Sequence, residues 1–246
     1  MNKAVVVIPT YNEIENIEII LEKTFSLNLG LDILVMDDNS PDKTFVKVQE
    51  IIDKDTYKGQ LSLIVREQKE GLGKAYIAGF KHVLKQEYKY IIEMDADLSH
   101  DPKYLVSFLE NIQDNDLVIG SRYVTGGGVL NWSPFRKLIS AGGSFYSRTL
   151  LGIDIQDVTG GFKCFRREVL QSIDLDNLIT TGYAFQIEMN YRASIMGYRV
   201  KEVPIIFEDR VAGKSKMSKK IFIEALLKVV VLRMHKKDIL ASIHAT

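Results

Sequence analysis

The sequence has little of what marks several common classes of protein. Cys164 is the only cysteine among 246 residues, which excludes an internal disulfide and a zinc site built from cysteines and favours a reducing compartment. The 32 basic residues are balanced by 32 acidic residues, so no excess of positive charge indicates nucleic-acid binding. No GxGxxG motif opens a predicted helix, and Gly126 to Gly128 lack that spacing, which argues against a dinucleotide-binding fold.

The apolar stretches are too short to cross a membrane comfortably. Built as a helix rising ~1.5 Å per residue, Ile221 to Met234 would fall about 9 Å short of a ~30 Å hydrocarbon core. Lys220, Glu224 and Lys228 form a polar stripe, so this helix is amphipathic. We expect it to pack on the rest of the chain, with a membrane surface or a membrane-anchored partner protein as the alternatives. Since no apolar leader and cleavage site follow the first residues MNKA, we expect a cytoplasmic protein.

Apolar runs alternate along the chain with stretches of helical periodicity. Strands are predicted at residues 4–8, 32–36, 61–65, 90–94, 117–120, 163–165 and 199–207, and helices at about 14–25, 43–53, 74–85, 102–112, 134–150 and 182–196. Asn12 is the expected N-cap of the first helix. The alternation predicts an α/β fold with a mainly parallel, open sheet and helices on both faces. We expect one domain, residues 1–217, followed by the amphipathic helix and tail, residues 218–246.

Two acidic residues, Asp95 and Asp97, stand where the predicted strand 90–94 ends. In an extended chain residues i and i+2 project from the same face, so both carboxylates can reach one divalent cation. Oxygen ligands favour Mg²⁺ or Mn²⁺, and such an ion usually completes its coordination with substrate phosphates. The pair therefore predicts a metal and diphosphate site at the carboxyl end of this strand. The alternative is an acidic surface turn ahead of Pro102.

Two more polar clusters follow predicted strands, Tyr11-Asn12-Glu13 after the first and Asp37-Asp38 after the second. Ligands of open α/β sheets bind outside the carboxyl ends of the strands, so we expect these clusters to share one crevice with the acidic pair. Asp37 can accept hydrogen bonds from a nucleobase or ribose, and Tyr11 offers packing surface with a polar tip. The alternative for Asp37 and Asp38 is helix capping and turn formation.

Three further charged residues allow a functional and a structural role. Arg122 follows an apolar strand and is expected to bind a diphosphate, with pairing to a nearby carboxylate as the alternative. Asp157 is either catalytic or caps the turn around it. Glu188 either lines the crevice or forms a surface salt bridge with Arg192, four residues on, which we favour.

The predicted helix 134–150 carries a candidate phosphate site. Arg136 and Ser140 are four residues apart and share one face, and a guanidinium beside a hydroxyl suits a phosphate monoester. The apolar side chains around them are expected to belong to the core rather than to a lipid groove: Phe135, Leu138, Ile139 and Phe145.

The segment 208–216 has the composition of a mobile loop. It combines Gly213 with two flanking cations, Arg210 and Lys216, and lacks apolar periodicity. This predicts a lid that closes over a diphosphate, with an ordinary exposed basic loop as the alternative.

Short motifs lie in collinear order along the chain: PTYNE from Pro9, DDNSPD from Asp37, GLGKA from Gly71, DADLSH from Asp95 and GSRY from Gly120. Together they resemble the motifs of family-2 inverting glycosyltransferases. The second half contributes WSPFRKLISAGGSFYSR, DVTGGFKCFRREVL, GYAFQIEM and VPIIFEDRVAGKSK, which are similar to stretches of the dolichyl-phosphate, or polyprenyl-phosphate, mannosyltransferases. The resemblance spans about Val5 to Met217.

The resemblance implies a Rossmann-like nucleotide-diphospho-sugar transferase fold and a role for each matching residue. The implied nucleotide contacts are Pro9, Tyr11, Glu13, Val35 and Asp37. The residues implied around the metal and diphosphate are Asp95, Ala96 and Asp97, with Ser99 near the third ligand position. Arg210 and Lys216 would contact the phosphates of the sugar nucleotide. Arg136 and Ser140 would bind the phosphate of the lipid acceptor.

The implied reaction is transfer of mannose from GDP-mannose to a polyprenyl phosphate on the cytoplasmic face of a membrane. The second pKa of a phosphate monoester is near ~6, so the acceptor oxygen is already an anionic nucleophile at neutral pH and needs no general base. The metal on Asp95 and Asp97, with Arg210 and Lys216, would stabilise the departing nucleoside diphosphate. Direct attack would invert the anomeric carbon. UDP-glucose or another donor is the close alternative, and a non-catalytic nucleotide-sugar-binding subunit is the distant one.

Overall fold

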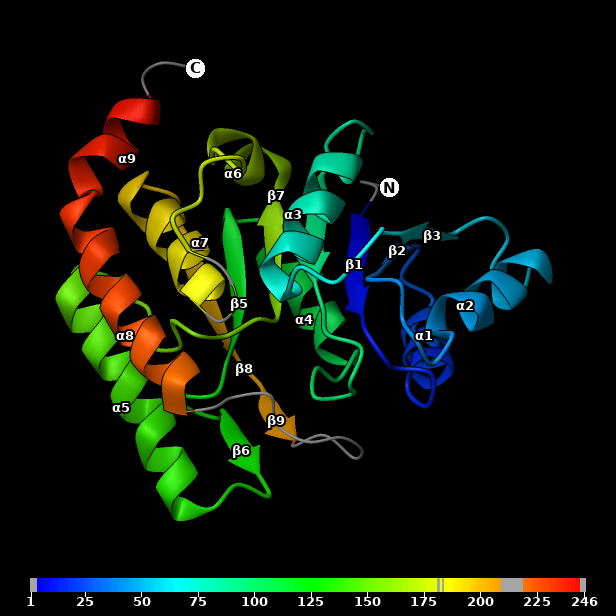
Figure 1. Ribbon diagram of the computed structural model, residues 1–246, viewed down its shortest axis with the longest axis horizontal. Coiled ribbons are helices and arrows are strands. Elements are labelled where there is room, and N and C mark those ends of the chain that lie inside the picture. The colour runs from blue at the N-terminus through cyan, green and yellow to red at the C-terminus, as the bar shows by residue number, and fades with distance from the viewer. Residues whose placement is uncertain (1–3, 181, 183, 209–218, 244–246) are drawn as a thin grey trace.

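The computed structural model describes residues 4–180, 182, 184–208 and 219–243 (Figure 1). Its strands are β1 (Ala4–Thr10), β2 (Asp32–Asp37), β3 (Leu61–Val65), β4 (Tyr90–Glu93), β5 (Leu117–Ser121), β6 (Gly128–Leu130), β7 (Lys163–Arg166), β8 (Val200–Pro204) and β9 (Ile206–Glu208). Seven of them form one sheet in the order β3-β2-β1-β4-β7-β5-β8, and β6 pairs with β9 in a separate ribbon. The large sheet is parallel except for β7, which runs antiparallel between β4 and β5.

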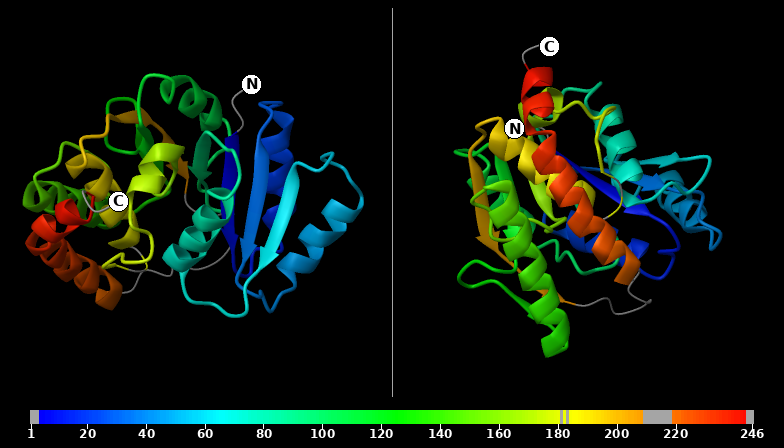
Figure 2. Two further views of the ribbon diagram at one scale, coloured as in Figure 1. Left: turned by 90° about the horizontal axis from the view of Figure 1, so that it is seen from above. Right: turned by 60° about the vertical axis from the view of Figure 1, so that its left-hand side comes forward.

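Helices cover both faces of the large sheet (Figure 2). They are α1 (Ile17–Ser26), α2 (Thr44–Asp53), α3 (Leu72–Val83), α4 (Tyr104–Asn111), α5 (Pro134–Leu151), α6 (Arg167–Ser172), α7 (Ala184–Ile195), α8 (Lys219–Met234) and α9 (Lys236–Ile243). The core beneath α1, α2 and α4 lies on one side of the sheet, and the core beneath α3, α6 and α7 lies on the other. The predicted α/β architecture is therefore confirmed.

Strand β1 shows why the apolar runs predicted the sheet correctly. All of its residues are buried. Val5 and Val7 point into one core and Val6 and Ile8 into the other, because successive side chains of a strand face opposite sides. A strand covered on both faces therefore needs a continuous apolar sequence.

The first helix begins later than predicted. Asn12 is not its N-cap, since Asn12 adopts a left-handed φ of 60° and α1 begins only at Ile17. The backbone N–H of the next residue, Glu13, donates to Thr44 Oγ1 at the start of α2, over 3.0 Å. This tertiary contact holds residues after β1 in a loop against α2, so they do not join the helix.

The last predicted strand is divided between the two sheets. Strand β8 ends at Pro204 and β9 begins at Ile206, and Ile205 joins them. The backbone N–H of Ile205 donates to Ser121 O of β5, and its carbonyl accepts from the N–H of Gly128, each over 3.0 Å. Strand β6 was not predicted because it is short and its partner lies far along the chain.

The C-terminal helices pack on the rest of the protein. Helix α8 lies beside α5 and α7 in both figures, and its Val229 and Leu232 are buried. On the predicted polar stripe, Glu224 is exposed and the ammonium of Lys228 donates to the carbonyl of Ile179 over 3.4 Å. Packing on the chain, the expected arrangement, is confirmed. The predicted boundary at residue 217 lies outside the described residues.

Close packing of α3 on the sheet predicts a stability effect at Gly79. A Cβ there would lie 2.6 Å from Val7 Cγ1 of β1 and 3.2 Å from Met36 Cγ of β2. Because both neighbours are held in the core, we expect Gly79→Ala to lower the free energy of unfolding by about 1–3 kcal/mol, measured by urea denaturation. The control is Gly142→Ala in α5, where an added Cβ would meet no side chain and no other segment within 4 Å. That change is expected to raise stability by up to ~1 kcal/mol, and equal effects at both sites would contradict the close approach.

Candidate active site

Three polar loops meet at one edge of the large sheet, as predicted. In the parallel pairing of β1 with its neighbours, Thr10 lies opposite Asp37 of β2 and Val7 opposite Glu93 of β4. The chain adds β2 and β3 on one side of β1 and then β4 on the other. This reversal of strand order marks the place where open α/β sheets bind their ligands.

Asp37 is buried and serves the turn that follows β2. Its carboxylate accepts hydrogen bonds from Thr10 Oγ1 and from the backbone N–H and Oγ of Ser40, each over 2.7 Å. Turn formation, the alternative to nucleotide binding, is thus what the structure contains. A contact between Asp37 and a nucleotide stays a prediction.

The other residues implied for the nucleotide lie beside this turn. Tyr11 is half-buried, and the ammonium of Lys69 lies 3.7 Å from the centre of its ring. The carboxylate of Glu13 accepts from Asn16 Nδ2 over 2.9 Å. The implied contacts Pro9 and Val35 lie inside β1 and β2 with buried side chains. Contact of those two residues with a nucleotide stays a prediction.

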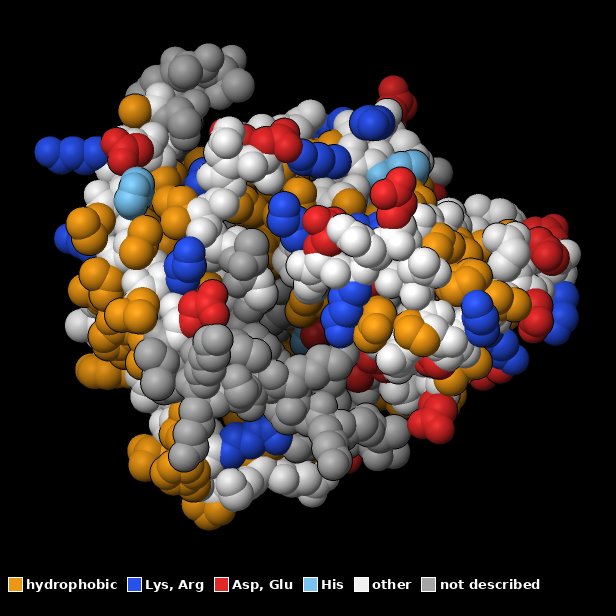
Figure 3. Space-filling view, in the orientation of Figure 1, with side chains coloured by type: hydrophobic (Ala, Val, Ile, Leu, Met, Phe, Trp, Pro, Cys, Tyr) orange, Lys and Arg blue, Asp and Glu red, His pale blue; other side chains and the backbone are white. Residues whose placement is uncertain are grey.

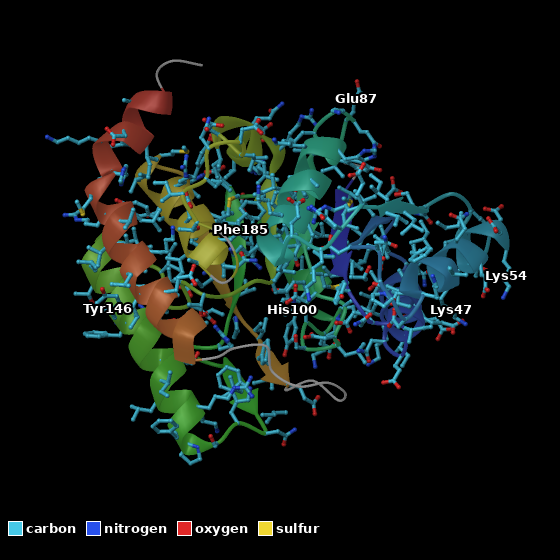
Figure 4. The ribbon with its side chains drawn as sticks, viewed as in Figure 1. Lys47, Lys54, Glu87, His100, Tyr146 and Phe185 are labelled. Carbon is cyan, nitrogen blue, oxygen red and sulfur yellow. The ribbon has the colours of Figure 1, made fainter. Side chains whose placement is uncertain are left out.

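The acidic pair follows β4 directly. A carboxylate oxygen of Asp95 accepts a hydrogen bond from the Tyr76 hydroxyl over 2.8 Å. The backbone N–H of Asp95 donates to His100 Nδ1 over 2.9 Å. Burial, followed by the charge of Asp95, raises the pKa of Tyr76 well above its usual value, so this hydroxyl stays protonated and donates. Asp97 Oδ1 accepts from both the backbone N–H and the hydroxyl of Ser99. Figure 4 shows His100 near the centre of the molecule.

The donor set of this loop fits a hard divalent cation. Asp95 and Asp97 supply carboxylate oxygens, while the hydroxyl of Ser99 donates to Asp97 and so supports that carboxylate. Across the described residues, no group of three or more His, Cys, Asp or Glu side chains is placed to hold a metal. Mg²⁺ and Mn²⁺ suit such a site because they are commonly held by one or two carboxylates together with ligand phosphates. Ala96, between the two acids in the sequence, is buried. The role of Ser99 as a third metal ligand stays a prediction.

A buried charged cluster under the acidic pair was missed by the sequence analysis. Glu93 and Lys163 are both inaccessible to solvent, with 3.8 Å between Lys163 Nζ and Glu93 Oε2, and Lys163 also donates to the side-chain carbonyl of Gln186. Burial raises the pKa of Glu93 to about 7, against the effect of Lys163, and lowers the pKa of Lys163 to about 8. The available signal was a glutamate inside the apolar run YKYIIEM.

Arg122 is engaged by the carboxylate of Asp157. Arg122 Nε donates to Oδ2 over 2.7 Å and an Arg122 Nη donates to Oδ1 over 2.6 Å, while the Arg122 backbone N–H adds a third bond over 2.9 Å. Burial alone would raise the pKa of Asp157, but the Arg122 guanidinium holds it below its usual value. The structural alternative for Arg122 is therefore present. Its contact with a diphosphate, and catalysis by Asp157, stay predictions.

The candidate phosphate site on α5 lies close to Arg122. The Arg136 guanidinium lies 4.1 Å from the centre of the Trp132 ring, and the Arg122 guanidinium lies 5.6 Å from the same ring. Ser140 Oγ accepts from the Tyr123 hydroxyl over 2.7 Å. The structure thus brings together two arginines that the sequence placed in separate roles.

The apolar side chains of α5 are not in the core, and this expectation was wrong. Phe135 and Leu138 are each 71% exposed and Phe145 is 61% exposed, while Ile139 is half-buried. The residues that the helix buries instead are Ser144, Ser147 and Leu151. The physical reason is that α5 lies on the outside of the molecule against α8, which leaves one of its faces uncovered (Figure 1).

Glu188 pairs with Arg192 as predicted, but the pair is buried rather than on the surface. The Glu188 carboxylate lies 2.8 Å from the Arg192 guanidinium. It also accepts from the backbone N–H groups of Ile179 and Thr180, over 3.0 and 2.7 Å. Glu188 therefore fixes the loop before α7. The predicted lid residues Arg210 and Lys216 lie outside the described residues.

Comparison with known proteins places these observations in a family. Residues 5–174 match the family described as Glycosyl transferase family 2. The chain is 43% identical over 227 residues to undecaprenyl-phosphate mannosyltransferase of Micrococcus luteus, covering 92% of each chain. It is 44% identical over 229 residues to polyprenol monophosphomannose synthase of Mycolicibacterium smegmatis, covering 92% of this chain and 85% of that protein.

A solved structure is similar in fold. It is a mannosyltransferase from Pyrobaculum calidifontis in complex with GDP-Man and Mn²⁺, with a TM-score of 0.57 and 17% sequence identity. The match covers 98% of this chain and 73% of that one. At this identity the likeness concerns the fold alone.

Proposed function

Because the chain belongs to glycosyltransferase family 2, we propose that it transfers mannose from GDP-mannose to a polyprenyl phosphate with inversion and releases GDP. The observation that carries the proposal is the position of Asp95 and Asp97 at the reversal of strand order, in a chain 43% and 44% identical to two polyprenyl-phosphate mannosyltransferases. The structural neighbour from Pyrobaculum calidifontis holds GDP-Man and Mn²⁺, the donor and one of the two metals named in this proposal.

Asp95 and Asp97 would hold Mg²⁺ or Mn²⁺ with the diphosphate of the donor. The bound ion would neutralise charge that develops on the departing GDP. The Tyr76 hydroxyl and the Ser99 hydroxyl each bond one of these carboxylates and so restrict its orientation. Preorganised acceptors lose little entropy when the ion and the donor arrive. Arg210 and Lys216 are proposed to contact the phosphates as well.

On the acceptor side, Arg136 and Ser140 would receive the lipid phosphate, with Arg122 near them. The phosphate oxygen is anionic at neutral pH, so the site must position it and need not deprotonate it. Attack on the face opposite the departing GDP inverts the anomeric carbon. An α-linked donor thus gives a β-linked mannosyl phosphate.

A panel of donors tests the proposal directly. GDP-mannose, other GDP-sugars and UDP-sugars, UDP-glucose among them, are each offered with a short-chain polyprenyl phosphate and Mg²⁺ or Mn²⁺. We expect GDP-mannose to give the fastest transfer and a β-linked product by NMR. Faster transfer from a UDP-sugar would show that this sugar nucleotide, and not GDP-mannose, is the donor. No transfer from any donor would favour a non-catalytic subunit.

Asp97→Asn is expected to slow transfer at least ~100-fold without unfolding the protein, because a neutral amide binds the cation and its diphosphate weakly. Turnover at saturating Mg²⁺ or Mn²⁺ and a thermal unfolding curve are the two measurements. Asp101→Asn is the matched control, since Asp101 lies in the same loop but pairs with the exposed Lys103 over 2.8 Å. Turnover of Asp97→Asn near that of the control would refute the metal assignment.

Arg136→Ala separates acceptor binding from donor binding. A charge-assisted hydrogen bond contributes about 1.5–3 kcal/mol, so the KM for polyprenyl phosphate should rise about 10- to 100-fold. Donor affinity, measured by calorimetry, should stay close to that of the wild type. Lys54→Ala, at an exposed position at the end of α2, is the control. Loss of donor affinity in Arg136→Ala would instead place this arginine on the donor side.

We propose that an apolar ridge on α5 and α8 rests on the cytoplasmic face of a membrane. The ridge consists of Phe135, Leu138, Phe145, Leu227 and Met234, all exposed. Hydrophobic side chains gather over these two helices in Figure 3. Among the residues that the structure describes, no helix has the length and apolar character needed to cross a bilayer.

Charge beside the ridge supports contact with anionic lipid. Lys137, Arg233 and Lys237 are exposed on the same helices or on α9. Apolar side chains that enter the boundary between head groups and acyl chains, flanked by cations, bind such surfaces in peripheral proteins. The polyprenyl lipids in the names of the two relatives fit this location.

The triple change of Phe135, Leu138 and Phe145 to Ser tests the ridge. Burial of a large apolar side chain contributes about 1.5–3 kcal/mol. We therefore expect at least ~10-fold weaker binding to vesicles containing phosphatidylglycerol, measured by co-sedimentation. Transfer to a water-soluble short-chain acceptor should change little. The control is Val46→Ser with Val65→Ser, at exposed positions of α2 and β3. A wild type that binds no vesicles would favour a membrane-anchored partner protein instead.

A further inference from the structure

Trp132 lies beside Arg136, the arginine proposed to bind the acceptor, and beside Arg122, which is predicted to bind the donor diphosphate. Its ring centre is 4.1 Å from the Arg136 guanidinium and 5.6 Å from the Arg122 guanidinium. Its Nε1 is buried without a hydrogen-bond partner among the described residues. The indole therefore interacts with the described residues around it through its ring face, which contacts the cations, and not through a hydrogen bond. Such cation–π contacts favour one arrangement of a flexible arginine side chain.

Phe207 connects this tryptophan to the metal loop. Its ring meets Trp132 edge-on, with 5.6 Å between centres, and meets His100 edge-on at 6.0 Å. The Arg122 guanidinium lies 5.5 Å from the Phe207 ring. His100 in turn accepts the backbone N–H of Asp95 over 2.9 Å. One backbone hydrogen bond and two ring contacts thus connect Asp95 to Trp132, which lies beside Arg136.

Two rings of this series, those of His100 and Phe207, are held by neighbouring elements. His100 is buried and stacks on Phe162 of the core, with 4.9 Å between ring centres. Phe207 belongs to β9, where it pairs with Val129 of β6, and the N–H of its neighbour Ile206 donates to the Tyr104 hydroxyl over 2.7 Å. Trp132 follows β6 by only two residues. The small ribbon therefore sets the position of Phe207 and constrains that of Trp132.

We infer that His100, Phe207 and Trp132 form an aromatic bridge that fixes the distance between the metal-binding acids and Arg136, the acceptor arginine. The inference deepens the proposed function and rests on it. The donor is held at Asp95, and the acceptor phosphate is held at Arg136. Transfer needs the attacking oxygen close to the anomeric carbon, so a small error in this spacing slows the reaction strongly. Trp132 and Phe207 are positioning residues, since they act through the arginines.

Kinetics of three variants test the bridge. Trp132→Leu is expected to raise the KM for polyprenyl phosphate about tenfold and to lower kcat about tenfold, while donor affinity by calorimetry is unchanged. Trp132→Phe, which keeps a ring, should recover most of both losses. Tyr57→Leu is the control, because it removes an aromatic stack with Phe25 outside the site, with 3.9 Å between ring centres.

A double-mutant cycle separates positioning from general destabilisation. If Trp132 acts through Arg136, then Trp132→Leu should raise the KM no further in an Arg136→Ala background. Independent effects that multiply would overturn the inference. Equal kinetics of Trp132→Leu and the wild type would overturn it as well.

A measurement without turnover keeps the inference distinct from the proposed function. Phenylglyoxal modification, read for each arginine by mass spectrometry, should be at least about threefold faster at Arg136 in Trp132→Leu than in the wild type. The rate in Trp132→Phe should match the wild type. If the wild type transfers no sugar but Arg136 shows this difference, the proposed function fails and the bridge stands. Equal rates in all three proteins would overturn the bridge.

Discussion

Parallel hydrogen bonding of β1 to both β2 and β4 is the constraint on which the site depends. It aligns the carboxyl ends of three strands, so the loops at residues 11–13, 37–42 and 95–100 open at one edge. The strands themselves are apolar because helices cover both faces of the sheet. Polar chemistry is therefore confined to their ends. The reversal of strand order beside β1 leaves room there for a ligand.

Two buried ion pairs hold charged side chains in fixed positions near this edge of the sheet. Arg122 with Asp157 and Glu93 with Lys163 lie almost or fully out of water. Such pairs add little net stability, since desolvation offsets most of the attraction, but loss of one partner costs about 3–5 kcal/mol. Their contribution is orientation. Asp157 bonds the Arg122 side chain at two nitrogen atoms, so the orientation of this cation is fixed.

Helix α5 combines two features that a water-facing helix would not have. It buries serines such as Ser144 and exposes Phe135 and Leu138, while Arg136 between them turns to the Trp132 ring. Under the proposed function, one helix meets both parts of a lipid phosphate: its apolar face meets the membrane and its arginine meets the charged head. Helix α8 extends the same surface with Leu227 and Met234.

The sequence by itself determined the sheet, the order of the elements and the acidic pair, because these follow from local patterns. Strand β3 has the predicted bounds, and the spacing of Asp95 and Asp97 placed them together at a strand end. Tertiary structure decided which partner each polar group meets. In the folded protein Asp37 accepts hydrogen bonds from Ser40 and Thr10, and Glu188 is buried with Arg192. Trp132 and Phe207 lie between His100 and the arginines. Periodicity shows that a helix has an apolar face, but it cannot show whether another element covers that face. The exposed Phe135 and Leu138 were therefore mistaken for core, since only the position of α5 at the outside of the fold decides their surroundings.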